Sequence, residues 1–335
     1  MAIRLYKPTL VSLLALSTVL LGDATIARAQ RFTVFDAPNA NDTVVRKINN
    51  RGDVLGIEII FPNTLRGFVR DEKGNFTVFD ATPQARTDPA DINARGEVVG
   101  TSGGGRGFVR NPDGDITLFD VPNALMTLGV CINARGEIAG NFVDGQFNFY
   151  SYVRDHKGNI VVFHASGEWP TYVAAINDSG EIAGSFYDAG RLRGYLRDRS
   201  GSLTVLDFDM AGNTLNNRGD LAGVYSQGGK IRGFVRTREG DITIFDAPDA
   251  SATFVSAIND GGEVAGSFGD TTQANKTRGF VRDIDGDVTV FDVPNAWSTV
   301  PASINDRGDV AGYFRETTQS SNRGFVFRRN EKASE

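Results

Sequence analysis

The stretch RGFVRDIDGDVTVFDVPNAWSTVPASINDRGDVAGYF, residues 278–314, decides the fold, because nearly the same text recurs along the chain. Three signatures can be followed: Arg-Gly-Phe-Val-Arg, Phe-Asp and Ile-Asn-x-x-Gly, each present seven times when close variants are included. The spacing from the first signature to the second is constant, whereas the stretch after Ile-Asn-x-x-Gly varies in length. The chain is therefore predicted to contain seven copies of one unit, with insertions confined to one loop.

Each unit is predicted to form four strands. In the quoted copy, residues 278–282 and 288–292 are apolar, β-branched runs around Asp-x-Asp-Gly, which is a hairpin turn signal. Residues 302–305 and 309–314 flank Asn-Asp-Arg-Gly, where Gly308 suits a left-handed turn position. Repeated sets of four antiparallel strands are typical of a propeller. We therefore expect an all-β fold, a seven-bladed β-propeller of four-stranded antiparallel blades.

The two ends of the chain indicate how such a ring would close. The chain begins on a strand at residues 32–36 and finishes on one at 323–327, and each lacks a neighbour of its own. We expect these N- and C-terminal strands to pair. Each Arg-Gly arginine before Arg323 is followed by an Asp fourteen residues later, but where Tyr150 replaces the arginine, His164 replaces the Asp. This joint change predicts that the paired positions touch, and closure would bring Arg323 to Asp36.

Residues 1–29 read as a signal peptide, and residues 30–335 as a single propeller domain. A basic start at Arg4 and Lys7 precedes an apolar run that is too short to span a bilayer, followed by Ala27-Arg28-Ala29. The mature protein is therefore expected to be secreted or periplasmic, with no membrane span. The net charge of −6 argues against nucleic acid as a partner. The single cysteine, Cys131, cannot form an internal disulfide.

The predicted topology places a candidate binding site on one face of the ring. Because strands alternate in direction, both tight glycine turns fall on one face, and the Pro-Asn-Ala links and variable loops fall on the other. Binding residues tend to lie on loops held by a rigid scaffold. Aromatic side chains there can stack on sugars or anchor a partner, although packing between blades is the alternative. The candidates are Phe147, Phe149, Tyr150, His164, Trp169, Tyr187 and Trp297.

The sequence offers little for catalysis. It contains no His-Glu-x-x-His motif and no Cys/His cluster. The segment from Asp283 to Asp287 loosely resembles a calcium loop but lacks the distal Glu, so a hairpin turn is the better interpretation. We predict no catalytic residue, metal or cofactor. The favoured function is a non-enzymatic binding module for a glycan, small molecule or protein. The alternative is a propeller enzyme, a lyase or hydrolase, acting on carbohydrate or another small molecule.

The repeated motifs resemble the HAF-type extracellular repeat of exported bacterial proteins. The resemblance rests on Ile304–Gly308 and Val310–Gly312, and of the His-Ala-Phe triplet only Phe280 is present. It spans residues 31–328. The resemblance implies an exported location and brings no established activity.

Overall fold

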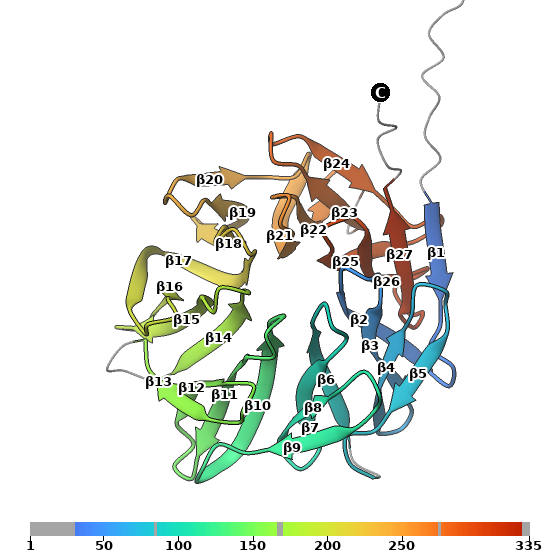
Figure 1. The fold of residues 1–335 in the computed structure, drawn as a ribbon. Helices are drawn as coiled ribbons and strands as arrows, with labels where there is room; N and C mark the ends of the chain where they lie inside the picture. The colour runs from blue at the N-terminus through green and yellow to red at the C-terminus, as the bar shows by residue number, and fades with distance from the viewer. Residues whose placement is uncertain (1–30, 84–85, 166–169, 274–275, 330–335) are drawn as a thin grey trace, which may run out of the picture.

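We analysed a computed structural model of the 335-residue chain. The structure describes residues 31–83, 86–165, 170–273 and 276–329, with the backbone alone at 31, 207–213 and 227. The predicted signal peptide, residues 1–29, lies outside them. The strands follow one another in a ring around a central axis (Figure 1). Their bounds are β1 Arg31–Phe35, β2 Asp42–Ile48, β3 Val54–Ile60, β4 Thr64–Arg70, β5 Phe76–Phe79, β6 Thr87–Ile92, β7 Val98–Ser102, β8 Gly107–Arg110, β9 Ile116–Phe119, β10 Ala124–Ile132, β11 Ile138–Asp144, β12 Phe149–Arg154, β13 Ile160–Phe163, β14 Thr171–Ile176, β15 Ile182–Asp188, β16 Arg191–Arg197, β17 Leu203–Leu215, β18 Leu221–Gln227, β19 Lys230–Arg236, β20 Ile242–Phe245, β21 Ala250–Ile258, β22 Val264–Asp270, β23 Lys276–Arg282, β24 Val288–Phe291, β25 Ser298–Ile304, β26 Val310–Arg315 and β27 Arg323–Arg328.

The strand that ends at Ile-Asn is innermost in each repeat, because these strands and the turns after them line the cavities on the axis. In one repeat β2 pairs with β3, β3 with β4 and β4 with β5, all antiparallel. The turn after β2 and the turn between β4 and β5 therefore share one face, here called the turn face. The link before β2 and the loop between β3 and β4 share the opposite link face. This division is the one that the sequence predicted.

The number of separate sheets differs from the prediction. Hydrogen bonding joins the strands into five sheets, three of four strands, one of seven and one of eight. The seven-stranded sheet arises because β17 pairs with β16 at one end and β18 at the other, where the link from Leu206 to Leu215 is shorter than in other repeats. In the eight-stranded sheet, Thr277 on β23 bridges in parallel to Ser298 on β25. Counted by hydrogen-bonded sheets, the propeller therefore has five blades, and the prediction of seven separate four-stranded blades is wrong.

The two ends of the chain pair as expected. Strand β1 runs antiparallel to β27, with Phe32 opposite Phe327. Arg323 donates to Asp36 at 2.9 Å, and the Phe32 and Phe327 rings stack at 5.0 Å. Because β27 also pairs with β26, the first strand completes the last repeat and closes the ring.

Neighbouring repeats are held together by aromatic and guanidinium packing. The aromatic residue of each Arg-Gly-Phe signature is fully buried. In six of the seven repeats it meets the phenylalanine of the preceding repeat, as Phe108 does edge-on with Phe79 at 6.2 Å; the exception is Phe234, which follows Leu206. The Arg110 guanidinium lies 5.1 Å from the centre of the same Phe79 ring. Cation–π contacts of this kind add to the apolar burial. The predicted contact between Tyr150 and His164 is also present, with ring centres 5.0 Å apart.

The asparagine of each Ile-Asn signature joins its repeat to the next. Within its own turn, the Asn49 side-chain oxygen accepts the N–H groups of Arg51 at 3.0 Å and Asp53 at 2.9 Å. Its amide group donates to the backbone oxygen of Asn93 in the next repeat at 3.1 Å. The pattern continues through all seven repeats until Asn305 donates to Asn49 at 3.2 Å. This circle of hydrogen bonds fixes the inner ends of the strands around the axis; its other members are Asn133, Asn177, Asn216 and Asn259.

Candidate functional site

A channel along the propeller axis holds two cavities end to end. The cavity at the turn face has a volume of about 160 Å³ and the one nearer the link face about 190 Å³. They share five lining residues, and together they form what we call the axial channel. A larger cavity of about 360 Å³ lies at the turn face between neighbouring turns, near Arg218 and Ile284. The shared lining residues of the two axial cavities are Lys47, Asp91, Ile176, Thr214 and Leu215.

The channel wall breaks the symmetry of the repeats. At the position before the Ile-Asn signature, the first two repeats carry charged residues, whereas the other five carry small ones. One position earlier, Arg46 stands where the other described side chains are Ala90, Val130, Ala174, Ser256 and Ala302. A binding or catalytic site in a ring of repeats is expected where the residues of one or two repeats differ from those of the others. The residues before the signature are, in order, Lys47, Asp91, Cys131, Ala175, Thr214, Ala257 and Ser303.

Two ion pairs connect the first two repeats beside the channel, which Arg46, Lys47 and Asp91 line. Arg46 donates to Asp88 at 3.2 Å, with the two side chains 44% and 51% exposed. Lys47 lies 3.8 Å from Asp91, whose carboxylate also accepts the N–H groups of Ile92 at 2.9 Å and Ile132 at 3.0 Å. Asp91 is thus held in place on several sides, while Asp88 remains open to a ligand. We refer to Arg46, Lys47, Asp88 and Asp91 as the axial charges.

An apolar collar surrounds the channel on its link-face side. Side chains two positions apart on a strand point to the same side. The residues two positions before Arg46, Ala90, Val130, Ala174, Ser256 and Ala302 are therefore expected to face the axis. Asp88 is the charged member of this set. Burial, and then the nearby Tyr187, raise the pKa of Tyr172, so it stays neutral. The collar consists of Val44, Leu128, Tyr172, Phe254 and Val300.

Two of the residues predicted to bind lie beside this collar. The Phe149 ring is 5.9 Å from that of Tyr172, and Tyr187, which is 40% exposed, lies on the adjacent β15. Phe147, in the loop before them, is 73% exposed. These aromatic residues therefore gather on the link face, as the sequence predicted.

The other predicted residues lie apart from the collar. Tyr150 stacks on Phe142 at 5.0 Å, meets His164, and donates to Asp144 at 3.2 Å. Desolvation and the Asp144 carboxylate raise the Tyr150 pKa. Trp297 is half-buried, and its backbone N–H donates to Arg315. Trp169 lies outside the described residues.

Cys131 lines the channel, but its surroundings disfavour the thiolate that a nucleophilic cysteine needs. The side chain is buried, with its sulfur 3.6 Å from the Ala139 oxygen. Burial, and then the nearby Asp91, raise the pKa of the thiol far above its usual range. Neither histidine lines either axial cavity. Among the described residues, no three His, Cys, Asp or Glu side chains are grouped to hold a metal, and no helix has the length and hydropathy to cross a membrane.

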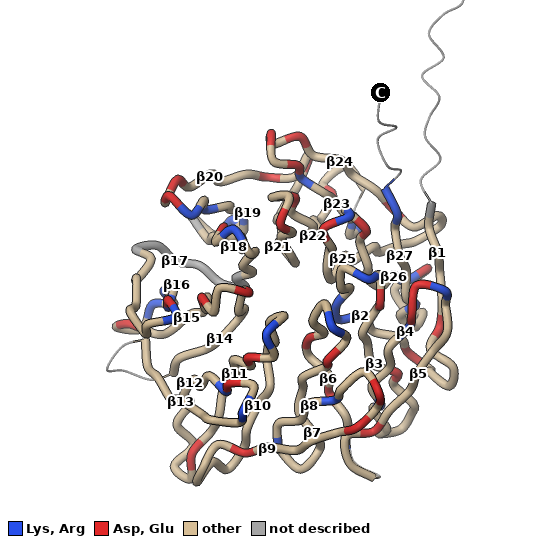
Figure 2. The backbone as a smooth tube through the Cα atoms, in the orientation of Figure 1, with Lys and Arg blue, Asp and Glu red and all other residues tan. Residues whose placement is uncertain are grey.

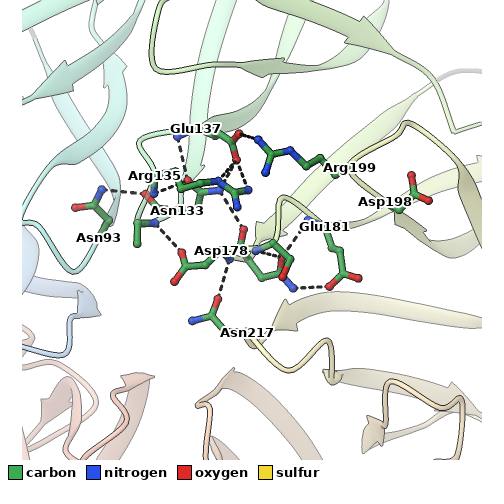
Figure 3. A network of polar contacts seen from close by, with 12 residues as sticks. Asn93, Asn133, Arg135, Glu137, Asp178, Glu181, Asp198, Arg199 and Asn217 are labelled. Carbon is green, nitrogen blue, oxygen red and sulfur yellow. Dashed lines mark hydrogen bonds and ion pairs between the residues drawn. The ribbon is translucent and has the colours of Figure 1, made fainter.

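Turns at the other end of the channel form a polar network (Figure 3). Asp178 accepts the backbone N–H of Ala134 at 2.7 Å, and its own N–H donates to Asn217 at 2.8 Å. Further out, Glu137 accepts from Arg135 and, across the repeat boundary, from Arg199 at 3.1 Å. Burial acts to raise the Glu137 pKa, but bonds from Arg135 and Asn133 outweigh it, and the pKa is lowered. Basic and acidic residues are interspersed around the whole ring (Figure 2).

The axial charges were not among the residues predicted from sequence. Their signal was present, because aligning the seven copies shows charge at these inner positions in two adjacent repeats alone. This charge pattern points to the channel only if the strand that ends at Ile-Asn is the innermost one. The sequence pattern did not show this.

Comparison with known proteins establishes the fold. No protein-family model matches this sequence, and no curated protein matches it. Among solved structures, a streptogramin B lyase is 16% identical with a TM-score of 0.61, covering 89% of this chain and 98% of that one. A catalytically inactive virginiamycin B lyase from Staphylococcus aureus, solved with quinupristin, is 17% identical with a TM-score of 0.62, covering 90% and 100%. A puromycin hydrolase is 12% identical with a TM-score of 0.58, covering 84% of this chain and 52% of that one. The chain therefore has the all-β propeller fold that these proteins share.

Proposed function

We propose that the protein is an enzyme, a lyase or hydrolase, that takes a small molecule into the link-face half of the axial channel. The observation that carries this proposal is the set of axial charges on one wall of a channel whose link-face half is otherwise lined by uncharged side chains. Charged groups behind an apolar collar suit a substrate with a polar reacting group and an apolar periphery. The likeness to lyases and a hydrolase supports catalysis over binding alone.

The contacts of the axial charges assign different roles to them. Asp88 is open, with one carboxylate oxygen on Arg46, so it is the candidate general base. Arg46 and Lys47 are placed to stabilise negative charge that develops on a substrate oxygen. Asp91, which is mostly buried and accepts two backbone N–H groups, orients Lys47.

Turnover by the mature protein, residues 30–335, tests the proposal. The protein would be incubated with a library of cyclic peptides, esters, lactones and glycosides, and the products followed by mass spectrometry. Hydrolysis adds one water, whereas elimination breaks a bond without changing the total mass. We expect Asp88→Asn to reduce turnover about 100-fold, the lower end for loss of a general base. The matched control is Asp120→Asn, which removes an exposed Arg106 ion pair of the same kind away from the axis.

The pattern across the variants decides between the outcomes. Loss of turnover in Asp88→Asn with full activity in Asp120→Asn supports the proposal. Equal loss in both variants would contradict it. Saturable binding without turnover of any compound would also overturn it and leave a binding protein.

A non-enzymatic binding function is the second candidate. It is favoured by the aromatic residues at the link face, where Phe149 meets Tyr172 and Phe147 is largely exposed. Under this function, Phe147→Ala and Tyr187→Ala weaken binding of a glycan or protein, and Asp88→Asn leaves it unchanged.

We also propose that the protein is exported and related to the HAF-type extracellular repeats. The basic and apolar start of the chain and the Ile304–Gly308 motif support this. Fractionation of the native cells, with N-terminal sequencing of the product, would show whether cleavage occurs after Ala29.

A further inference from the structure

A second ring of hydrogen bonds lies at the turn-face end of the channel, formed by the residues that directly follow the Ile-Asn asparagines. This second ring has a gap. Five backbone N–H groups in the position after the ring asparagines each donate to a side-chain oxygen in the next repeat, at 2.7–3.0 Å. Among the described residues, the N–H groups of Asn50 and Ala94 find no such acceptor. The reason is in the sequence, because the repeats that should supply the oxygen carry Ala94 and Ala134.

The gap opens into the turn-face cavity. Asn50, Ala94 and Ala134 all line this cavity of about 160 Å³, and Lys47 lines it as well. Two residues of adjacent repeats whose N–H groups lack an acceptor in the ring therefore line the same cavity, and so does the cation Lys47. We propose that this gap binds the carboxylate group of a small organic acid, which accepts the N–H groups of Asn50 and Ala94 and completes the ring.

The acceptors used elsewhere in the ring favour a carboxylate. Three of the five are aspartates, namely Asp178, Asp260 and Asp306. Asp306 shows the arrangement that the ligand would copy, with one oxygen on the Asp260 N–H at 2.8 Å and the other on the Asn50 side-chain amide. Hydrogen bonds from N–H groups to an ionised oxygen are stronger than those to a neutral one.

Four aspartates and one lysine line the cavity, so an anion is expected only at the gap, where the ring has no acid of its own; the aspartates are Asp91, Asp178, Asp260 and Asp306. Asp178 and Asp306 flank the gap, but each already accepts a backbone N–H. Asp91, which lines the same cavity, is held by Lys47 and two N–H groups. Nearby Arg51 and Arg95 pair with acids of their own turns, Asp53 and Glu97. The gap, where Ala94 and Ala134 replace the acceptor residues, thus lacks an acid of its own. We expect the carboxylate to bind there with a dissociation constant in the millimolar range, and more weakly as the salt concentration rises.

This site is independent of the proposed enzymatic function. It lies at the opposite end of the channel from Arg46 and Asp88. It shares Lys47 with the axial charges, but its two N–H donors, on Asn50 and Ala94, belong to neither Arg46 nor Asp88. A failure of either proposal leaves the other standing.

An amide NMR titration tests the inference. The mature protein, labelled with deuterium and nitrogen-15, would be titrated with sodium acetate, with sodium chloride at equal ionic strength as the reference. We expect saturable downfield shifts of the Asn50 and Ala94 amide protons with acetate and not with chloride. In the double variant Ala94→Asp, Ala134→Asp, new side chains supply the missing acceptors, so acetate binding falls at least tenfold. The control Thr77→Asp adds a charge on exposed β5 and leaves binding unchanged.

A second variant keeps the test decisive if the double variant does not fold. Asp178→Ala removes the acceptor of the Ala134 N–H, so the Ala134 amide joins those that shift with acetate. Equal shifts in acetate and chloride, or no Ala134 response in Asp178→Ala, would overturn the proposal.

Discussion

Replacing Gly266 by alanine will lower the free energy of unfolding by about 3 kcal/mol, at the upper end of the usual cost of overpacking. A Cβ at this position would lie 2.1 Å from the backbone oxygen of Phe254 and 2.7 Å from the Phe280 ring. The first clash is with backbone on the innermost strand β21, so a rotamer change cannot relieve it. The strands would have to separate at the most crowded radius of the propeller.

Gly104→Ala is the matched control. A Cβ there would meet no atom within 4 Å, so its effect should stay within about 0.5 kcal/mol. Urea unfolding followed by tryptophan fluorescence and circular dichroism measures both variants. If the two variants unfold at the same urea concentration, β21 and β22 do not approach each other as closely at Gly266 as the structure shows.

The Phe35→Ala variant should lose about 3–5 kcal/mol of unfolding free energy, the usual cost of removing a buried phenylalanine. Phe35 lies on β1, is buried, and packs against Gly324 on the paired strand β27. Its ring also lies 4.9 Å from the Arg70 guanidinium. The substitution therefore weakens the seam that closes the ring.

Val34→Ala on the same strand serves as its control, because Val34 is exposed. It should change stability by no more than about 0.5 kcal/mol. Limited proteolysis with mass spectrometry should show earlier cleavage near residue 36 in Phe35→Ala than in Val34→Ala. Identical cleavage and unfolding in the two variants would mean that the terminal strands do not close the ring.

Much of the fold could be predicted from the sequence, because each repeat contains turn residues that mark where its strands end. The constant spacing of the signatures placed four strands in each unit, and the unpaired end strands predicted the pairing of β1 with β27. The Tyr150 and His164 exchange predicted a contact that the structure confirms. These features are local or depend on pairing, and repeated copies reinforce them.

The connection of the sheets could not be predicted in the same way. The link between Leu206 and Leu215 is shorter than in the other repeats, and the backbone continues through it as strand β17. Whether a short link forms a turn or a continuous strand depends on how closely neighbouring repeats approach. That distance is set by packing between repeats, which a repeat pattern does not report.

The site was predicted in part. Aromatic residues on the variable loops were expected on one face, and Phe149 and Tyr187 do lie beside the collar residue Tyr172. The axial charges were not predicted, because an alternating strand pattern does not show which strand of a repeat lies nearest the axis. The break in register between Val45 and Lys47 also carries Arg46 into the channel next to Lys47, and simple alternation would separate them.

Crystallographic soaking of the mature protein with a library of small-molecule fragments tests the central claim most directly, since it needs no known substrate. We expect fragments with a polar group and an apolar ring to collect in the link-face half of the axial channel, beside the Arg46–Asp88 ion pair and against the collar. Repeated occupancy of the larger turn-face cavity near Arg218 and Ile284, with no fragment beside the axial charges, would contradict it.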